Sequence, residues 1–165
     1  MSALALPEPE YRALPIFDRL PQGCFAWLCS DNSSHPHIRP GEWAVVDAGQ
    51  RRPVVGELFV IKFGPHRRHE RICLASLRPA RCLNKEPGTK NWHVGSVRNA
   101  EIRTFMATLE GTRLSDIEKN CMLIEAHNAV GGWTEGPYET EGKSYDHLCD
   151  CLMGMVIGLY QGPPL

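Results

Sequence analysis

The stretch from Phe25 to Phe63 constrains the fold more than any other part of the chain, because short apolar runs alternate in it with turn-forming residues. The apolar run 25–29 is followed by the polar run 30–34, whose side chains favour turns over strand ladders. Gly41 permits a sharp reversal before the next apolar run, 43–46. The pattern predicts a strand, a polar elbow, a strand, a loop and a strand, with the adjacent serines Ser33 and Ser34 at the elbow.

The last of these runs, 58–63, is apolar almost throughout, which predicts a strand covered on both faces. Gly64 and Pro65 end it, and 71–77 has the composition of the returning strand of a hairpin. Between the two strands lies a basic tip, 66–69, which we interpret as a solvated loop rather than as a nucleic-acid contact. A further short strand is predicted at 92–97.

A helix is predicted near 115–128. Ser115 and Glu118 have the spacing of a capping box, and Ile117, Cys121 and Ile124 recur on one face of the helix that would follow. The segment 121–124 also has the composition of a strand, so this alternative stays open. Residues 129–145 are rich in glycine and predict a long loop, which in a compact domain binds something or is mobile.

The length of 165 residues suits one domain, and the 42% hydrophobic and 22% charged content is typical of a soluble globular protein. We expect a proline-rich N-terminal arm at 1–24 and a β domain at 25–165, with an inserted loop and helical region at about 98–147. Neither a secretory signal nor a membrane-spanning run is found, so we expect a cytoplasmic protein without membrane contact. The formal net charge of −1 gives no electrostatic reason to expect direct nucleic-acid binding.

The seven cysteines are expected to be reduced, because disulfides are disfavoured in the cytosol. His147, Cys149 and Cys151 lie close together in the sequence, and a Cys-x-Cys on a strand would point both sulfurs to one face. Structural zinc sites usually show two paired clusters with wider spacing. We therefore expect no metal site and no cofactor.

The motifs of the elbow and the flanking strands occur in an informative order. They are Asp31-Asn32-Ser33-Ser34, Pro36, Ile38, Gly41-Glu42, Val45-Val46-Asp47 and Gly56-Glu57. This order resembles the core of the self-cleaving LexA- and UmuD-like serine–lysine peptidases, which include the C-terminal domains of many phage repressors. The ending 152–160, with two spaced glycines, looks like the closing strand of that family. The resemblance covers 25–77 and 148–160, and it implies a mainly β fold, a partly open barrel of sheets with one or two short helices.

In the resembled family a serine is the nucleophile and a lysine on a later strand is its base. Ser33 falls on the nucleophile position, and alignment of the strand end places Ala75 where the lysine would stand. No lysine occurs from 63 to 84, and an arginine stays protonated and cannot replace it. Asp31 stands where the family has glycine. The usual cleavage dipeptide, Ala-Gly or Cys-Gly, is absent upstream of Ser33.

Three hypotheses follow. The first is a non-catalytic relative of the peptidase domain, acting in dimerisation or partner binding in transcriptional regulation of the SOS or prophage type. The second is a serine peptidase or hydrolase that uses Ser33 with a non-standard base, for which His66, His69 and Lys62 are the candidates. The third is an unrelated all-β binding protein.

The C-terminal run 152–160 is almost free of polar residues, which raises the question of what covers it. If it were an open edge strand, a homodimer would cover it, as in the resembled family. The alternative is a central strand covered within one chain. The predicted core consists of Phe25, Trp27, Trp43, Val45, Leu58, Val60, Ile61, Ile72, Leu74, Val156 and Leu159.

Overall fold

A computed structural model describes residues 13–64, 66, 69–81 and 86–165. Its elements, in chain order, are β1 (Ile16–Phe17), β2 (Cys24–Leu28), β3 (Trp43–Asp47), β4 (Leu58–Phe63), β5 (His69–Pro79), β6 (Lys90–Gly95), α1 (Asn99–Thr108), α2 (Asp116–Val130), β7 (Thr134–Tyr138), α3 (Tyr145–Cys151) and β8 (Leu152–Tyr160). The predicted strands at 25–29, 43–46, 58–63, 71–77 and 92–97 are confirmed to within a few residues. The short strand β1 lies within the segment that the sequence assigns to the N-terminal arm.

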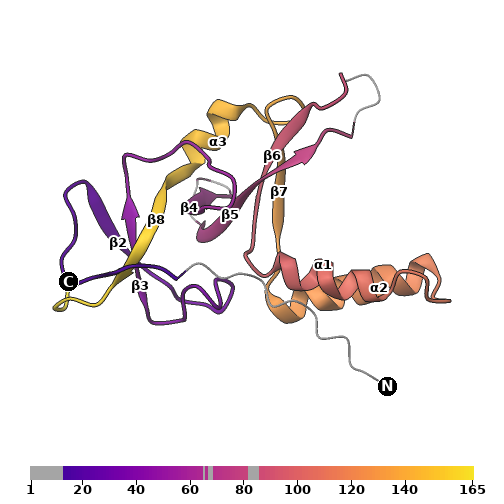
Figure 1. The fold of residues 1–165 in the computed structure, drawn as a ribbon, viewed down its shortest axis with the longest axis horizontal. Coiled ribbons are helices and arrows are strands. Elements are labelled where there is room, and N and C mark those ends of the chain that lie inside the picture. The colour runs from indigo at the N-terminus through magenta and orange to yellow at the C-terminus, as the bar shows by residue number, and fades with distance from the viewer. Residues whose placement is uncertain (1–12, 65, 67–68, 82–85) are drawn as a thin grey trace.

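The strands form one sheet in the order β2-β3-β8-β4-β5-β6-β7, and β1 pairs with the end of β8 (Figure 1). All pairs are antiparallel except β1 with β8. A hydrogen bond across the sheet shows that the sheet is curled. The Trp27 indole of β2 donates to Glu70 of β5 at 3.1 Å, although β3, β8 and β4 lie between these two strands in the sheet. The curl does not close the sheet into a barrel, and the prediction of a mainly β, partly open fold is confirmed.

Strand β4 is covered on both faces, as its uninterrupted apolar sequence predicts. Leu58 and Val60 belong to one buried cluster, and Phe59 and Ile61 belong to another on the opposite face. The first cluster also contains Cys29, Ile38, Ala44, Val46, Ile72 and Val156, and the second contains Cys73, Ala75, Val94, Tyr138, Leu148, Cys151 and Leu152. We call them the elbow-side cluster and the far-side cluster, because Cys29 and Ile38 flank the elbow.

Most of the predicted core residues are buried or half-buried. Those that are buried are Val45, Leu58, Val60, Ile61, Ile72 and Val156, and those that pack partly buried against the elbow-side cluster are Phe25, Trp27, Leu74 and Leu159. Trp43 is the exception, because 36% of its surface is exposed.

The described residues form three helices, so the prediction of one or two short helices is wrong. The capping box at Ser115 is confirmed, and it begins α2, which ends at the left-handed Gly131. The sequence gives little sign of α1, since Arg98 at its N-cap makes no side-chain cap bond. The glycine-rich segment 129–145 is not a continuous loop, because it contains β7. Within the described part of the chain, no helix combines the length and apolar character of a membrane span.

Strand β8 is not an open edge. It lies between β3 and β4 and exchanges ladder hydrogen bonds with both, so the edge-strand argument for dimerisation is wrong. The near absence of polar residues in 152–160 has a different reason: a central strand with neighbours on both sides and side chains on both faces has little contact with water.

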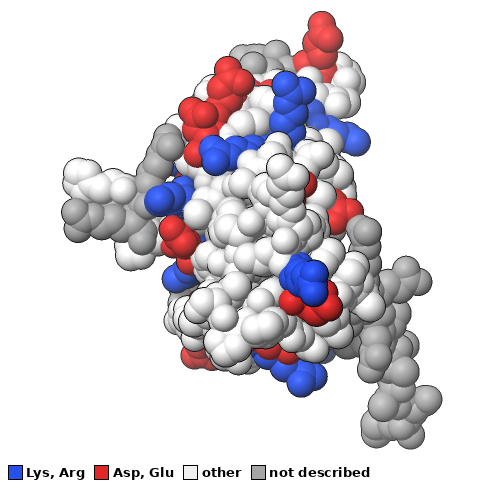
Figure 2. Space-filling model, turned by 90° about the vertical axis from the view of Figure 1, so that its left-hand side faces the viewer, with Lys and Arg blue, Asp and Glu red and all other residues white. Residues whose placement is uncertain are grey.

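One face of the sheet carries a partly exposed apolar row where β2, β3, β8 and β1 meet. Leu28 stands opposite Trp43, Trp43 opposite Tyr160, and Tyr160 opposite Phe17, so the four side chains lie side by side on one face. Leu28 is 43% exposed and Trp43 is 36% exposed. Figure 2 looks onto this end of the molecule, and the centre of the surface carries few charged side chains. We call these four residues the apolar row.

We expect Ile61→Ala to lower the free energy of unfolding by about 2–5 kcal/mol, because it leaves a cavity in a fully buried site. The control Val55→Ala changes a side chain that is 56% exposed and should shift the free energy by at most about 0.5 kcal/mol. Urea unfolding followed by circular dichroism measures both values. Equal effects of the two substitutions would contradict the assignment of β4 to the centre of the core.

Candidate functional site

The polar elbow between β2 and β3 is a loop closed at its neck by backbone hydrogen bonds. The Cys29 amide donates to the Glu42 carbonyl at 2.9 Å, and the Gly41 amide donates to the Cys29 carbonyl at 2.7 Å. Gly41 has a φ of +88°, the left-handed region that the sharp reversal requires. Ile38 and Cys29 are buried and anchor the loop on the elbow-side cluster. Ser33 is therefore held by a loop of fixed shape.

The Ser33 hydroxyl has one hydrogen-bond partner among the described residues, the carboxylate of Asp31. Its Oγ lies 2.5 Å from Asp31 Oδ1, and the same oxygen accepts from the Ser33 amide at 2.9 Å. An aspartate that bonds the backbone two residues ahead is a local turn device. We therefore assign Asp31 to the shape of the elbow.

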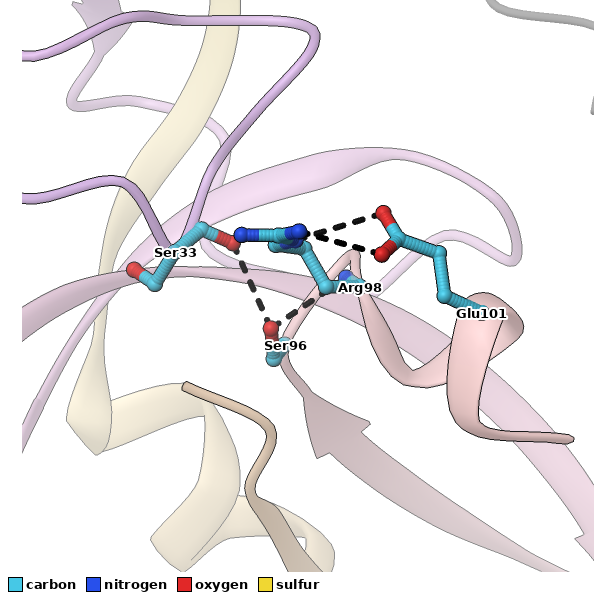
Figure 3. A network of polar contacts seen from close by, with 4 residues as sticks. All are labelled: Ser33, Ser96, Arg98 and Glu101. Carbon is cyan, nitrogen blue, oxygen red and sulfur yellow. Dashed lines mark hydrogen bonds and ion pairs between the residues drawn. The ribbon is translucent and has the colours of Figure 1, made fainter. Parts of the chain in front are cut away.

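The backbone of Ser33 is fixed from the opposite side by Ser96, which follows β6. Ser96 is buried, and its hydroxyl donates to the Ser33 carbonyl at 3.3 Å and accepts from the Arg98 amide at 3.2 Å. Arg98 in turn forms a bidentate pair with Glu101 at 3.2 and 3.1 Å. Figure 3 shows the Ser33 hydroxyl pointing away from Ser96 and Arg98. The network thus positions the elbow but does not contact its hydroxyl.

The structure brings none of the candidate bases into hydrogen-bond contact with Ser33 in the described part of the chain. Lys62 pairs with Glu70 at 3.8 Å, and Glu70 also accepts from Trp27. The His69 ring lies 6.1 Å from the Phe63 ring, centroid to centroid, and His66 is an exposed residue of the hairpin tip with a φ of +62°. The roles of Ser33, His66, His69 and Lys62 in catalysis stay predictions.

Ala75, which aligns with the lysine of the resembled peptidases, is fully buried in the far-side cluster. Side chains alternate along a strand, and the neighbouring Leu74 packs against the elbow-side cluster instead. A side chain at position 75 therefore points to the face opposite the elbow. Positions 74 and 76 face the elbow, and they hold leucine and serine. No register of β5 places a lysine near Ser33, because the strand contains none.

Two groups beside Ser33 are buried and polar. Ser34 is 1% exposed, and its hydroxyl has no hydrogen-bond partner among the residues described. The Cys29 thiol donates to the Asp31 carbonyl at 3.2 Å, and burial raises the pKa of this thiol. A thiol with a raised pKa stays protonated and is a poor nucleophile. Cys29 therefore packs the base of the elbow.

The cysteine and histidine cluster of the sequence lies in α3. His147 Nε2 and Cys151 Sγ are 3.7 Å apart, one helical turn from each other. Cys149 and Cys151 are on this helix and not on a strand, so their sulfurs do not share a face as the Cys-x-Cys argument supposed. Over residues 13–64, 66, 69–81 and 86–165, no group of three His, Cys, Asp or Glu side chains could hold a metal ion.

The elbow network contains residues that sequence reasoning missed. The spacing of Asp31 and Ser33 is that of a local turn and could have been recognised. Ser96 could not, because it lies 63 positions from Ser33 and nothing in its neighbourhood marks it. Gly131, at the end of α2, is a second distant neighbour: a Cβ atom there would lie 3.8 Å from that of Ser33.

Comparison with known protein families, with curated proteins and with solved structures finds no match to this chain.

We expect Ser96→Ala to destabilise the protein by about 1–3 kcal/mol, because it leaves the part-buried Ser33 carbonyl and the part-buried Arg98 amide without their partner. Hydrogen exchange should show faster exchange of the Arg98 amide in this variant. Ser30→Ala, at an exposed position of the same loop, serves as control and should leave exchange at Arg98 unchanged. Unchanged exchange in both variants would contradict the positioning role of Ser96.

Proposed function

We propose that the chain is a non-catalytic relative of the LexA- and UmuD-like peptidase domain, acting as a dimerisation or partner-binding module in transcriptional regulation of the SOS or prophage type. One observation carries the proposal. The Ser33 hydroxyl has only the exposed Asp31 carboxylate as a partner among the described residues, and β5 supplies no lysine to the face of the elbow. A serine without a base is a poor nucleophile.

The architecture supports this proposal in a second way. The elbow is anchored by Cys29 and Ile38 below it and by Ser96 behind it. These contacts keep the loop rigid without requiring catalysis, and a rigid exposed loop suits recognition of a partner. The serine peptidase remains the alternative outcome of the experiment below.

The apolar row is a better candidate for a homodimer contact than β8, because β8 is already paired on both sides. The row is contributed by four strands, and its centre, Trp43, is the predicted core residue that is left exposed. Tryptophan and tyrosine are enriched at the buried centres of protein interfaces. A two-fold axis through this face would pair the row with its own copy. We therefore propose the row of Leu28, Trp43, Tyr160 and Phe17 as the dimer contact.

Purified protein is expected to stay intact during prolonged incubation at alkaline pH. A lysine-dependent enzyme would gain activity there, because its deprotonated lysine is the active base, whereas this chain lacks that base. Intact-mass spectrometry of the wild type and of Ser33→Ala measures the outcome. A discrete pair of fragments that forms in the wild type and is absent in Ser33→Ala would establish the peptidase instead.

Light scattering is expected to give about twice the chain mass of 18.5 kDa for the wild type and a single chain mass for Trp43→Glu. A carboxylate in the middle of the row would have to be desolvated in the dimer. Leu77→Glu is the matched control, because Leu77 is also 36% exposed but lies on β5, outside the row. A monomeric wild type at tens of micromolar, or equal loss of pairing in both variants, would refute the contact.

A further inference from the structure

The groove between β5, α1 and α2 contains two arginine side chains that form no ion pair with another described residue. Arg78, near the end of β5, and Arg103, on α1, line an open groove of about 440 Å³. Neither guanidinium forms an ion pair or a hydrogen bond within the described part of the chain. Among the described residues, Glu110 is the one carboxylate that lines the same groove, and His127 is the one other titratable group there.

The arginines are close enough to act on one another. Burial lowers the pKa of Arg78, and the positive charges of Arg103 and Arg81 lower it further. Burial, followed by the charges of Arg78 and Arg81, lowers the pKa of His93 as well, against an opposing effect of Glu141. Like charges gathered in one place cost free energy unless an anion compensates them. With a net charge of −1, the chain has no general excess of basic residues that would explain the cluster.

One side of the groove is lined by the polar, hydrogen-bonded side chain of Asn99. Asn99 is 8% exposed, and its amide nitrogen donates to the Trp133 carbonyl at 2.8 Å and to the Thr134 hydroxyl at 3.0 Å. Its amide oxygen, Oδ1, is buried without a partner among the described residues. A smaller cavity of about 30 Å³, also lined by Arg78, Asn99 and Arg103, leads from here toward Ser96.

The walls of the groove are apolar. Ile102 and Met106 on α1 and Leu123 on α2 line it on the helix side. Ligand sites commonly combine such walls with a few polar groups that fix orientation, in volumes of roughly 300–1,000 Å³. The groove therefore offers Arg78 and Arg103 to an anion and an apolar wall on the helix side to an apolar group.

We propose that this groove binds a small phosphate monoester, whose phosphate bridges Arg78 and Arg103 and whose apolar part contacts Ile102, Met106 and Leu123. Guanidinium groups bind phosphate oxygens through paired, charge-assisted hydrogen bonds. A phosphate suits the site better than a carboxylate, because its three terminal oxygens can accept from both guanidinium groups that line the groove, while Glu110 offsets only one of the two charges. The site is separate from the apolar row and does not depend on the proposed dimer.

Calorimetric titration of the full chain with phenyl phosphate, at constant ionic strength and about pH 8, tests the proposal. Benzoate carries the same ring with a single charge, and inorganic phosphate carries the dianion without the ring. We expect phenyl phosphate to bind most tightly, and Arg103→Gln to weaken its binding by about tenfold or more. Arg113→Gln removes the same charge from an exposed position in the connection between α1 and α2 and should change binding by less than about twofold.

Arg78→Lys provides a second variant, which keeps the charge but loses the planar fork, and it should weaken phenyl phosphate binding by several-fold. Circular dichroism checks that each variant is folded. If Arg103→Gln is unfolded, the binding measured for Arg78→Lys decides the test. Absence of saturable binding to the wild type at millimolar phenyl phosphate would overturn the proposal. Equal weakening by Arg113→Gln would overturn it too, since binding would then follow net charge. Tighter binding of benzoate would assign the groove to carboxylates and overturn the phosphate assignment.

Discussion

The pairing of β8 with both β3 and β4 is the constraint on which the rest of the structure depends. β3 and β4 follow each other in the sequence, yet they are separated in the sheet by the last strand of the chain. Val156 of β8 belongs to the elbow-side cluster and Leu152 to the far-side cluster, so neither core is complete without this strand. The residues that β8 and β3 pair are more than a hundred positions apart in the sequence. Closing so long a loop lowers the conformational entropy of the chain, and burial of the two cores must offset this cost.

The same arrangement explains why the elbow and the apolar row lie where they do. The elbow leaves β2 at Cys29 and returns at β3, and its buried residues reach the core that β8 completes. On the opposite face of β2 and β3, Leu28 and Trp43 are only partly covered by the described part of the chain. This face is covered in part, since Val45 on it is fully buried, and it is exposed at Leu28 and Trp43. Exposed apolar patches are uncommon on monomeric proteins, and this is the reason for relating the apolar row to the proposed dimer.

The sequence predicts those parts of the fold whose signal is local. Ser115 and Glu118 define a helix start within four residues, and the uninterrupted run 58–63 reports burial of both faces of β4. The residue pattern along one strand does not say which strands become its neighbours. The apolar run 152–160 is therefore compatible both with a paired edge strand and with a central strand. Trp43 shows the same limit, since its exposure is decided by what covers β3 and not by its own composition. At the site, Asp31 and Ser33 are two residues apart and predictable as a turn, whereas Ser96 comes from the end of another strand and is not predictable.

The second helix of the protein has a consequence for how the molecule moves. α2 spans fifteen residues without one buried side chain, and Ile117 and Ile124 on it are 77% and 61% exposed. A helix with so little packing can unfold locally at a free-energy cost well below that of global unfolding. Such an opening would release Leu123 and His127 from the arginine-lined groove while the sheet stays intact. The side of the groove formed by β5 would remain during such an opening, whereas the side formed by α2 would be present only in molecules whose α2 is folded. The shape of the groove is therefore an average over an ensemble of conformations.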